Sequence, residues 1–137
     1  MSHEDAPTEA QVAKYAYLSP MLDSALAEMR EFSKKKQDGI VSEVKIKVLN
    51  RLLKEIKDVV AKEESAAYLD LLSEDELPQN SDAVLMLGQF RAALDSFHSR
   101  RYRTVGYEWA WMTKEWLEEH DRMREAGELD EDDDEFE

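Results

Sequence analysis

Residues 40–62 read IVSEVKIKVLNRLLKEIKDVVAK, and how this stretch folds decides the fold class of the chain. Its start is ambiguous, because Val44, Ile46 and Val48 alternate with lysines as they would in a half-exposed strand. Between Ile46 and Val60, however, apolar residues recur at three- and four-residue steps, which is typical of one face of a helix. A lone strand would have no partner. We therefore predict a helix over residues 40–62 and an all-α fold.

Two segments on either side of this helix show the same period. Residues 8–36 begin with Thr8 and Gln11, which fit a capping box, and Pro20 inside them predicts a kink or a restart of the helix. Residues 80–100 place apolar side chains on one face behind a polar N-cap. The sequence therefore predicts three long amphipathic helices before residue 101.

A last helix is predicted over about residues 104–125, although Gly106 falls in its first turn and obscures its start. Residues 65–73 suffice only for a short helix. Together these segments predict an antiparallel bundle of four long helices plus one short connector helix over residues 8–125. A coiled-coil hairpin dimer is the alternative, because the apolar seams of the first two helices suit either arrangement.

The C-terminal end differs in composition from the helical segments. Residues 125–137 hold nine carboxylates and no Lys or Arg, and their large apolar side chains are Leu129 and Phe136. So little apolar surface does not offset the entropy that ordering the segment would cost. We therefore expect a disordered acidic tail at residues 126–137, and a flexible N-terminus at residues 1–7.

The composition of the chain excludes several classes of protein. Its 137 residues suit one domain, and the absence of Cys rules out disulfides, thiol catalysis and thiolate metal sites. The N-terminus has no basic, apolar leader, and no apolar run reaches about 18 residues, so we expect a cytoplasmic protein without a membrane span. HExxH, Walker A, GxGxxG and GxSxG motifs are absent. We therefore expect no enzyme activity, no catalytic residues, no metal and no cofactor.

The predicted helix 104–125 carries aromatic residues on both of its sides. Trp109 and Trp116 lie on the stripe that faces the predicted core, whereas Tyr107 and Trp111 lie about 180° away. Tyr and Trp are enriched among the hot spots of protein interfaces. We interpret Tyr107 and Trp111 as an exposed pair that binds a partner. The alternative is a central helix that is packed on both sides.

Two groups of basic residues stand out despite the net charge of −14. One group follows a single face of the predicted helix 40–62. The other lies around Tyr102, and such mixtures of guanidinium groups and aromatic rings bind single-stranded nucleic acid. The overall acidity opposes a polyanion at long range. The alternatives are a solvated helix face or a surface that binds an acidic protein. The candidate polyanion-binding residues are Lys47, Arg51, Lys54, Arg100, Arg101 and Arg103.

The acidic tail is itself a candidate binding segment. Short runs of carboxylates with an apolar residue dock on basic, partly apolar grooves, and they also imitate the charge of nucleic acid. A purely solubilising extension is the alternative. The tail residues predicted to contact a partner are Asp130, Glu131, Asp132, Asp133, Asp134, Glu135 and Phe136.

These features together predict a non-enzymatic interaction protein, which acts as a subunit, adaptor or inhibitor of a larger assembly. Its protein partner would offer a basic surface or groove, because carboxylates accelerate encounter with such a surface. Self-association into a homo-oligomer is a further expectation. The alternative function is a helical nucleic-acid-associated protein that binds through the basic residues, with the tail as autoinhibitor or nucleic-acid mimic.

Overall fold

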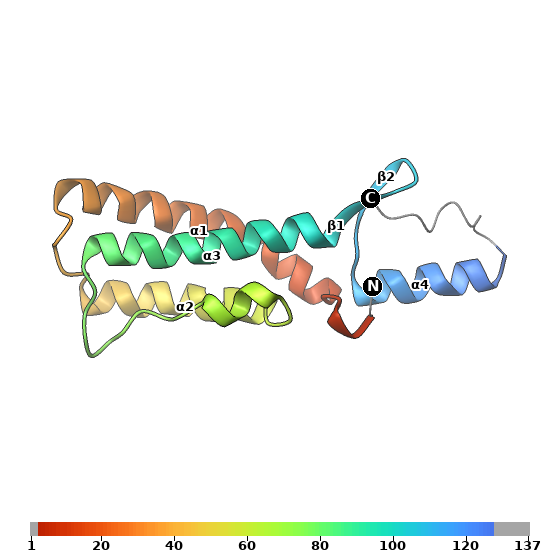
Figure 1. Ribbon diagram of the computed structural model, residues 1–137, viewed down its shortest axis with the longest axis horizontal. Coiled ribbons are helices and arrows are strands. Elements are labelled where there is room, and N and C mark those ends of the chain that lie inside the picture. The colour runs from red at the N-terminus through yellow and green to blue at the C-terminus, as the bar shows by residue number, and fades with distance from the viewer. Residues whose placement is uncertain (1–2, 128–137) are drawn as a thin grey trace.

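The computed structural model describes residues 3–127, so the predicted tail from residue 128 onward lies outside the described residues. The described residues form four α-helices, two short 3-10 helices and one two-stranded sheet (Figure 1). In chain order these elements are η1 (His3–Asp5), α1 (Glu9–Lys35), α2 (Glu43–Val59), η2 (Glu64–Tyr68), α3 (Asn80–Arg101), β1 (Tyr102–Val105), β2 (Glu108–Trp111) and α4 (Lys114–Glu125).

The chain is mostly helical, as the sequence predicts. Helices α1 and α2 fall within the segments predicted to be helical, and α3 ends one residue beyond its predicted segment. The last predicted helix is wrong over residues 104–111, which belong to a β-hairpin, so the fold is not purely α-helical. The predicted short helix at residues 65–73 is reduced to the single 3-10 turn η2. Beyond that turn the chain is extended, and it buries Leu69 and Leu72.

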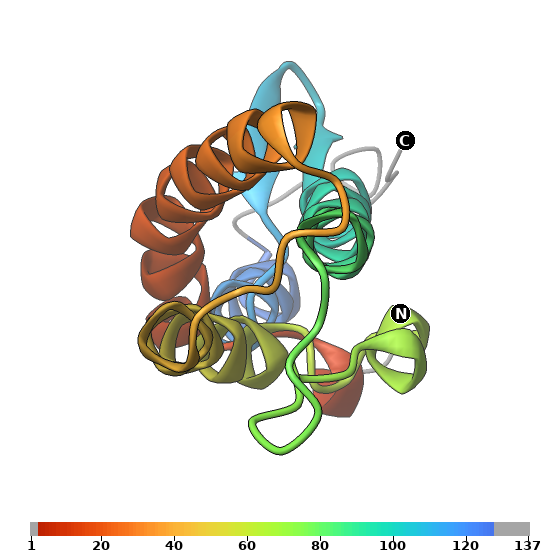
Figure 2. The same ribbon diagram turned by 90° about the vertical axis from the view of Figure 1, so that its left-hand side faces the viewer.

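Helix α1 begins where the capping box predicts. The Thr8 side chain accepts a hydrogen bond from the backbone N–H of Gln11, and the Thr8 N–H donates to the Gln11 side chain at 2.9 Å. The helix does not restart at Pro20, because one continuous helix contains that residue. Figure 2 shows the axis of α1 curving along its length. Such bending is expected where proline removes one backbone donor.

Helices α2 and α3 begin at the same end of the molecule and run parallel, while α1 runs antiparallel to both (Figure 1). The backbone N–H of Asn80 at the start of α3 donates to the Gly39 carbonyl, just before α2, at 2.7 Å. The chain therefore returns along the body between η2 and α3. Asn50 fixes this return, since its buried amide donates to the Leu72 carbonyl at 2.8 Å and accepts from the Leu72 N–H at 2.9 Å.

Two apolar clusters hold the described residues together. The larger lies among α1, α2, α3 and the return segment, and Phe90, Phe97 and Leu53 are among its most buried members. The smaller joins α4 to the N-terminal segment and consists of Ala6, Met112 and Leu117 with partly buried neighbours. Helix α4 extends beyond the end of the other three helices (Figure 1). The predicted four-helix bundle is therefore not confirmed.

The N-terminal residues pack against this end of the molecule. Residues 3–7 belong to the predicted flexible N-terminus, yet Ala6 is fully buried and η1 lies against α4. The backbone N–H of Lys114 donates to the Pro7 carbonyl at 2.7 Å, and His3 contacts Asp121 at 3.1 Å. The N-terminal segment thus connects α4 to the rest of the fold.

Candidate interaction surface

The β-hairpin projects from the end of α3 (Figure 1). Its strands are antiparallel, with Tyr102 opposite Trp111 and Val105 opposite Glu108, so that Gly106 and Tyr107 form a two-residue turn. Gly106 has a φ of 65°, whereas no non-glycine residue described has a positive φ. This pattern, with glycine at the first turn position, is that of a type II′ hairpin turn.

Alternate residues of a strand share a face, so the hairpin has two faces with different side chains. Val105 and Ala110 pack on the smaller cluster beside α4. Tyr102, Trp109 and Trp111 lie on the opposite face. The hairpin thus joins the two clusters while it keeps an aromatic face.

Aromatic rings continue from the core to this face without a break. Phe97 is buried in α3, and its ring centroid lies 5.7 Å from that of Trp111. Trp111 contacts Tyr102 at 5.3 Å, and Tyr102 stacks on Trp109 at 5.3 Å with an interplanar angle of 20°. Tyr15 from α1 closes the packing against Trp111 at 5.2 Å. Aromatic pairs at these separations add about 0.5–1.5 kcal/mol of stability beyond the burial of apolar area.

The outer end of this series is open to solvent. Trp109 is 60% exposed, and Tyr107 at the turn is fully exposed. Trp111, by contrast, is half-buried and packs against the larger cluster. The predicted pairing of Tyr107 with Trp111 on an exposed helix face rests on helical geometry that this segment does not have. The exposed aromatic residues of the hairpin are instead Tyr107 and Trp109.

A buried ion pair fixes the point where the hairpin leaves α3. Arg101 Nη2 lies 2.7 Å from Glu63 Oε2, and each of the two side chains is only 4% exposed. Arg101 Nη2 also donates to the Asp5 carbonyl at 2.9 Å, and the Met112 N–H donates to the Arg101 carbonyl at 2.6 Å. Removing one partner of such a pair strands a buried charge. The last residue of α3 is thereby held in place from three sides.

The predicted basic residues are dispersed. Arg101 is buried in that ion pair, so the fold does not present its guanidinium to solvent. Arg103 is half-buried on β1, while the half-exposed Arg100 lies 3.9 Å from Glu63. On α2 the three predicted residues are exposed, and Lys47 lies 3.5 Å from Glu43. The structure therefore brings the α2 residues Lys47, Arg51 and Lys54 together on one helix, but gives no single basic patch at the hairpin.

Within the described residues, His98 and His120 pack beside aromatic rings and not in a metal site. The tail residues 130–136 lie outside the described residues. His98 lies among the aromatic rings, 5.3 Å from Trp111, and His120 stacks on Trp116 at 4.7 Å. Across residues 3–127 no group of three or more His, Asp or Glu side chains is placed to hold a metal ion. No helix in that range has the length and apolar character needed to cross a bilayer.

Sequence reasoning missed the strand positions of Tyr102 and Trp109, although the signal was present. Residues 102–111 read YRTVGYEWAW, in which β-branched and aromatic residues flank a glycine with four residues before it. Such a run is typical of a two-residue hairpin. The same aromatic residues also satisfy the helical period, which favoured the wrong interpretation.

No protein-family model matches the chain, and no curated protein or solved structure shows a significant match to it.

Proposed function

We propose that this protein is a non-enzymatic interaction module that binds another protein chain through the aromatic face of its hairpin. The observation that supports this most is the exposure of Tyr107 and Trp109 on a hairpin whose other two aromatic rings, Tyr102 and Trp111, are partly buried and contact one another. Exposed Trp and Tyr side chains are frequent hot spots, and a rigid base lowers the entropy lost on binding.

In the expected mechanism, aromatic rings and carboxylates have different roles. Trp109 and Tyr107 bury apolar ring surface against the partner and determine the affinity. The net charge of −14, to which the C-terminal carboxylates contribute most, attracts a basic partner surface and raises the association rate. Salt should therefore slow association more than it speeds dissociation.

Affinity capture from the native host tests this proposal. The double variant Tyr107→Ala/Trp109→Ala should lose the stoichiometric partner that the wild-type chain retains at moderate salt. If either residue is a hot spot worth at least about 2 kcal/mol, the affinity falls by about 30-fold or more. The far-ultraviolet circular dichroism of the variant should remain that of the folded chain.

Tyr68→Ala provides the matched control, because Tyr68 is 76% exposed and lies in η2, away from the hairpin. This variant should retain the partner at wild-type yield. Equal retention by the hairpin double variant, with its fold intact, would refute the proposal.

The nucleic-acid alternative gains no support from the side chains at the hairpin. Arg101 is committed to Glu63, and Arg103 lies on the face opposite Trp109. Stacked bases and phosphate contacts need aromatic and cationic groups on one surface. For this reason we propose protein binding alone.

A further inference from the structure

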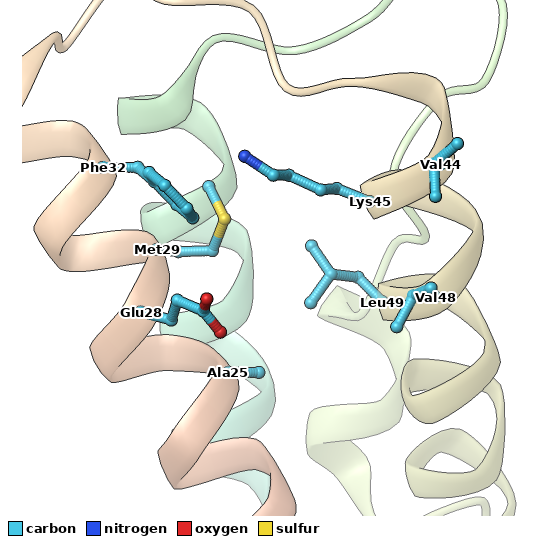
Figure 3. Close-up of a pocket in the computed structure, with 8 residues that line it drawn as sticks. All are labelled: Ala25, Glu28, Met29, Phe32, Val44, Lys45, Val48 and Leu49. Atoms are coloured by element: carbon cyan, nitrogen blue, oxygen red, sulfur yellow. The ribbon is translucent and has the colours of Figure 1, made fainter.

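A second surface lies on the opposite part of the body, between α1 and α2. Figure 3 shows the groove, with Phe32 of α1 and Lys45 of α2 extending toward one another across it. The ammonium of Lys45 lies 3.6 Å from the centroid of the Phe32 ring. The groove has a volume of about 210 Å³, and its lining is formed by Ala25, Glu28, Met29, Phe32, Val44, Lys45, Val48 and Leu49.

Exposed apolar side chains border this groove on both helices. Val44 and Val48, one turn apart on α2, are 71% and 65% exposed. On α1, Met21 precedes Ala25 by one turn and is 53% exposed, and Tyr17 lies one further turn away. Four large, exposed apolar side chains thus lie along α1 and α2, namely Tyr17, Met21, Val44 and Val48. A row of this kind is typical of a surface that another chain covers.

Charged residues of opposite sign lie beside the groove on the two helices. Glu28 lies on the α1 border and lines the groove itself. On the α2 border, Arg51 continues the row of Val44 and Val48 at the next turn, and Lys47 stands beside it. Lys47 lies 3.5 Å from Glu43 of its own helix, which leaves Arg51 as the cation that can face Glu28. Farther along the same helix pair, Lys14 of α1 lies 2.8 Å from Glu55 of α2. Charges of opposite sign thus occur at matching heights on the two helices, which makes the groove complementary to a rotated copy of itself.

We propose that a second copy of this chain covers the groove, with a twofold axis parallel to the two helices. This axis places α1 of each copy over α2 of the other, because rotation about it exchanges the two borders. Glu28 of one copy then faces the Arg51 border of the other, and the contact occurs twice. Since α1 and α2 are antiparallel, the four helices form an antiparallel four-helix arrangement in which every neighbour is antiparallel.

The size of the surface determines how strong this dimer is. Helix α2 has 17 residues and is about 25 Å long, and a helix pair is about 20 Å wide. The groove face thus offers about 500 Å² per copy, or about 1,000 Å² in total, which is the lower limit for a specific interface. Interfaces of this size are typical of weak, transient complexes. We therefore expect a dissociation constant of about 10 µM to 1 mM for the dimer.

Analytical ultracentrifugation over a concentration series tests the proposal on the full chain. The wild type should convert from monomer to dimer as its concentration rises toward about 1 mM. Val48→Asp should weaken dimerisation at least about 10-fold, because it puts a carboxylate into the apolar row. Leu85→Asp is the matched control, since Leu85 is 66% exposed on α3 and should leave the dimer unchanged.

Charge reversal distinguishes the twofold dimer from non-specific association. Glu28→Arg and Arg51→Glu should each weaken the dimer, and the double variant should restore it, because the restored pairs form between copies. A wild type that remains monomeric to about 1 mM would overturn the proposal, as would dimerisation that Val48→Asp leaves unchanged or charge reversal without rescue. None of these outcomes depends on the hairpin, so the two proposals fail separately.

Discussion

Asn50 shows how a single buried polar residue selects the topology. Its amide satisfies both backbone groups of Leu72, so the extended return segment lies against α2 without losing hydrogen bonds. Unpaired backbone groups are costly when buried. The amide therefore stabilises the return segment between η2 and α3, which lets α2 and α3 run parallel.

Replacing Asn50 with Ala should lower the free energy of unfolding by about 2–3 kcal/mol, because it leaves a buried N–H and a buried carbonyl without partners. Urea denaturation followed by circular dichroism measures the change. Gln89→Ala on the exposed side of α3 should shift the free energy by less than about 0.5 kcal/mol. A similar midpoint for the two variants would contradict this role of Asn50.

Sequence reasoning succeeds for residues whose partners are near in the chain. Thr8 and Gln11 are three apart, so their capping box could be predicted from local spacing alone. Arg101 bonds Glu63, which lies 38 residues away, and no local pattern indicates that pair. From the sequence alone, Arg101 therefore groups with its basic neighbours Arg100 and Arg103.

Among the elements, the hairpin departs most from the sequence prediction. Val105, Trp109, Met112 and Trp116 are spaced as on a helix, yet Trp109 and Trp111 also alternate as on a strand. Packing favours the strand, in which Trp111 contacts both Phe97 and Tyr15. The backbone conformation of Gly106 then permits the tight turn.

Gly106→Ala should destabilise the hairpin by about 1–2 kcal/mol, because an alanine strains a position with a φ of 65°. We expect weaker near-ultraviolet circular dichroism from the tryptophans and unchanged helical signal. Gly88→Ala is the control, since the residue is helical and, apart from its chain neighbours and the nearby backbone of its own helix, no atom lies within 4 Å of the added methyl group. The free energy of unfolding of that variant should rise by about 0.5–1 kcal/mol, because alanine favours a helix more than glycine does. Equal effects of the two substitutions would argue against the hairpin turn.

At the scale of the whole molecule, the larger cluster and the smaller one divide the fold unequally. Helices α1, α2 and α3 share an extensive core, whereas α4 is held by Met112, Leu117 and its contacts with the N-terminal segment. The sequence predicts the three long helices and the part of the last helix that α4 occupies, but not this division. Apolar periodicity indicates which side of a helix is buried and not which neighbour buries it.

Hydrogen exchange should therefore show α4 opening at a lower free energy than the three long helices, since a small apolar cluster stabilises it locally. Mass spectrometry of exchanged peptides can resolve residues 114–125 from residues 80–101. The difference in protection between α4 and α3 should persist at denaturant concentrations well below the midpoint of unfolding. Protection of α4 equal to that of α3 would mean that the whole chain unfolds as one unit.

Photo-crosslinking tests the central claim, that the hairpin tip meets another protein, most directly. A benzophenone amino acid is placed at position 107, or at the exposed position 68 as a control, and the full chain is irradiated in its native host. We predict a covalent adduct with a different protein from position 107 and none from position 68. No adduct from position 107, or equal adducts from both positions, would contradict the account.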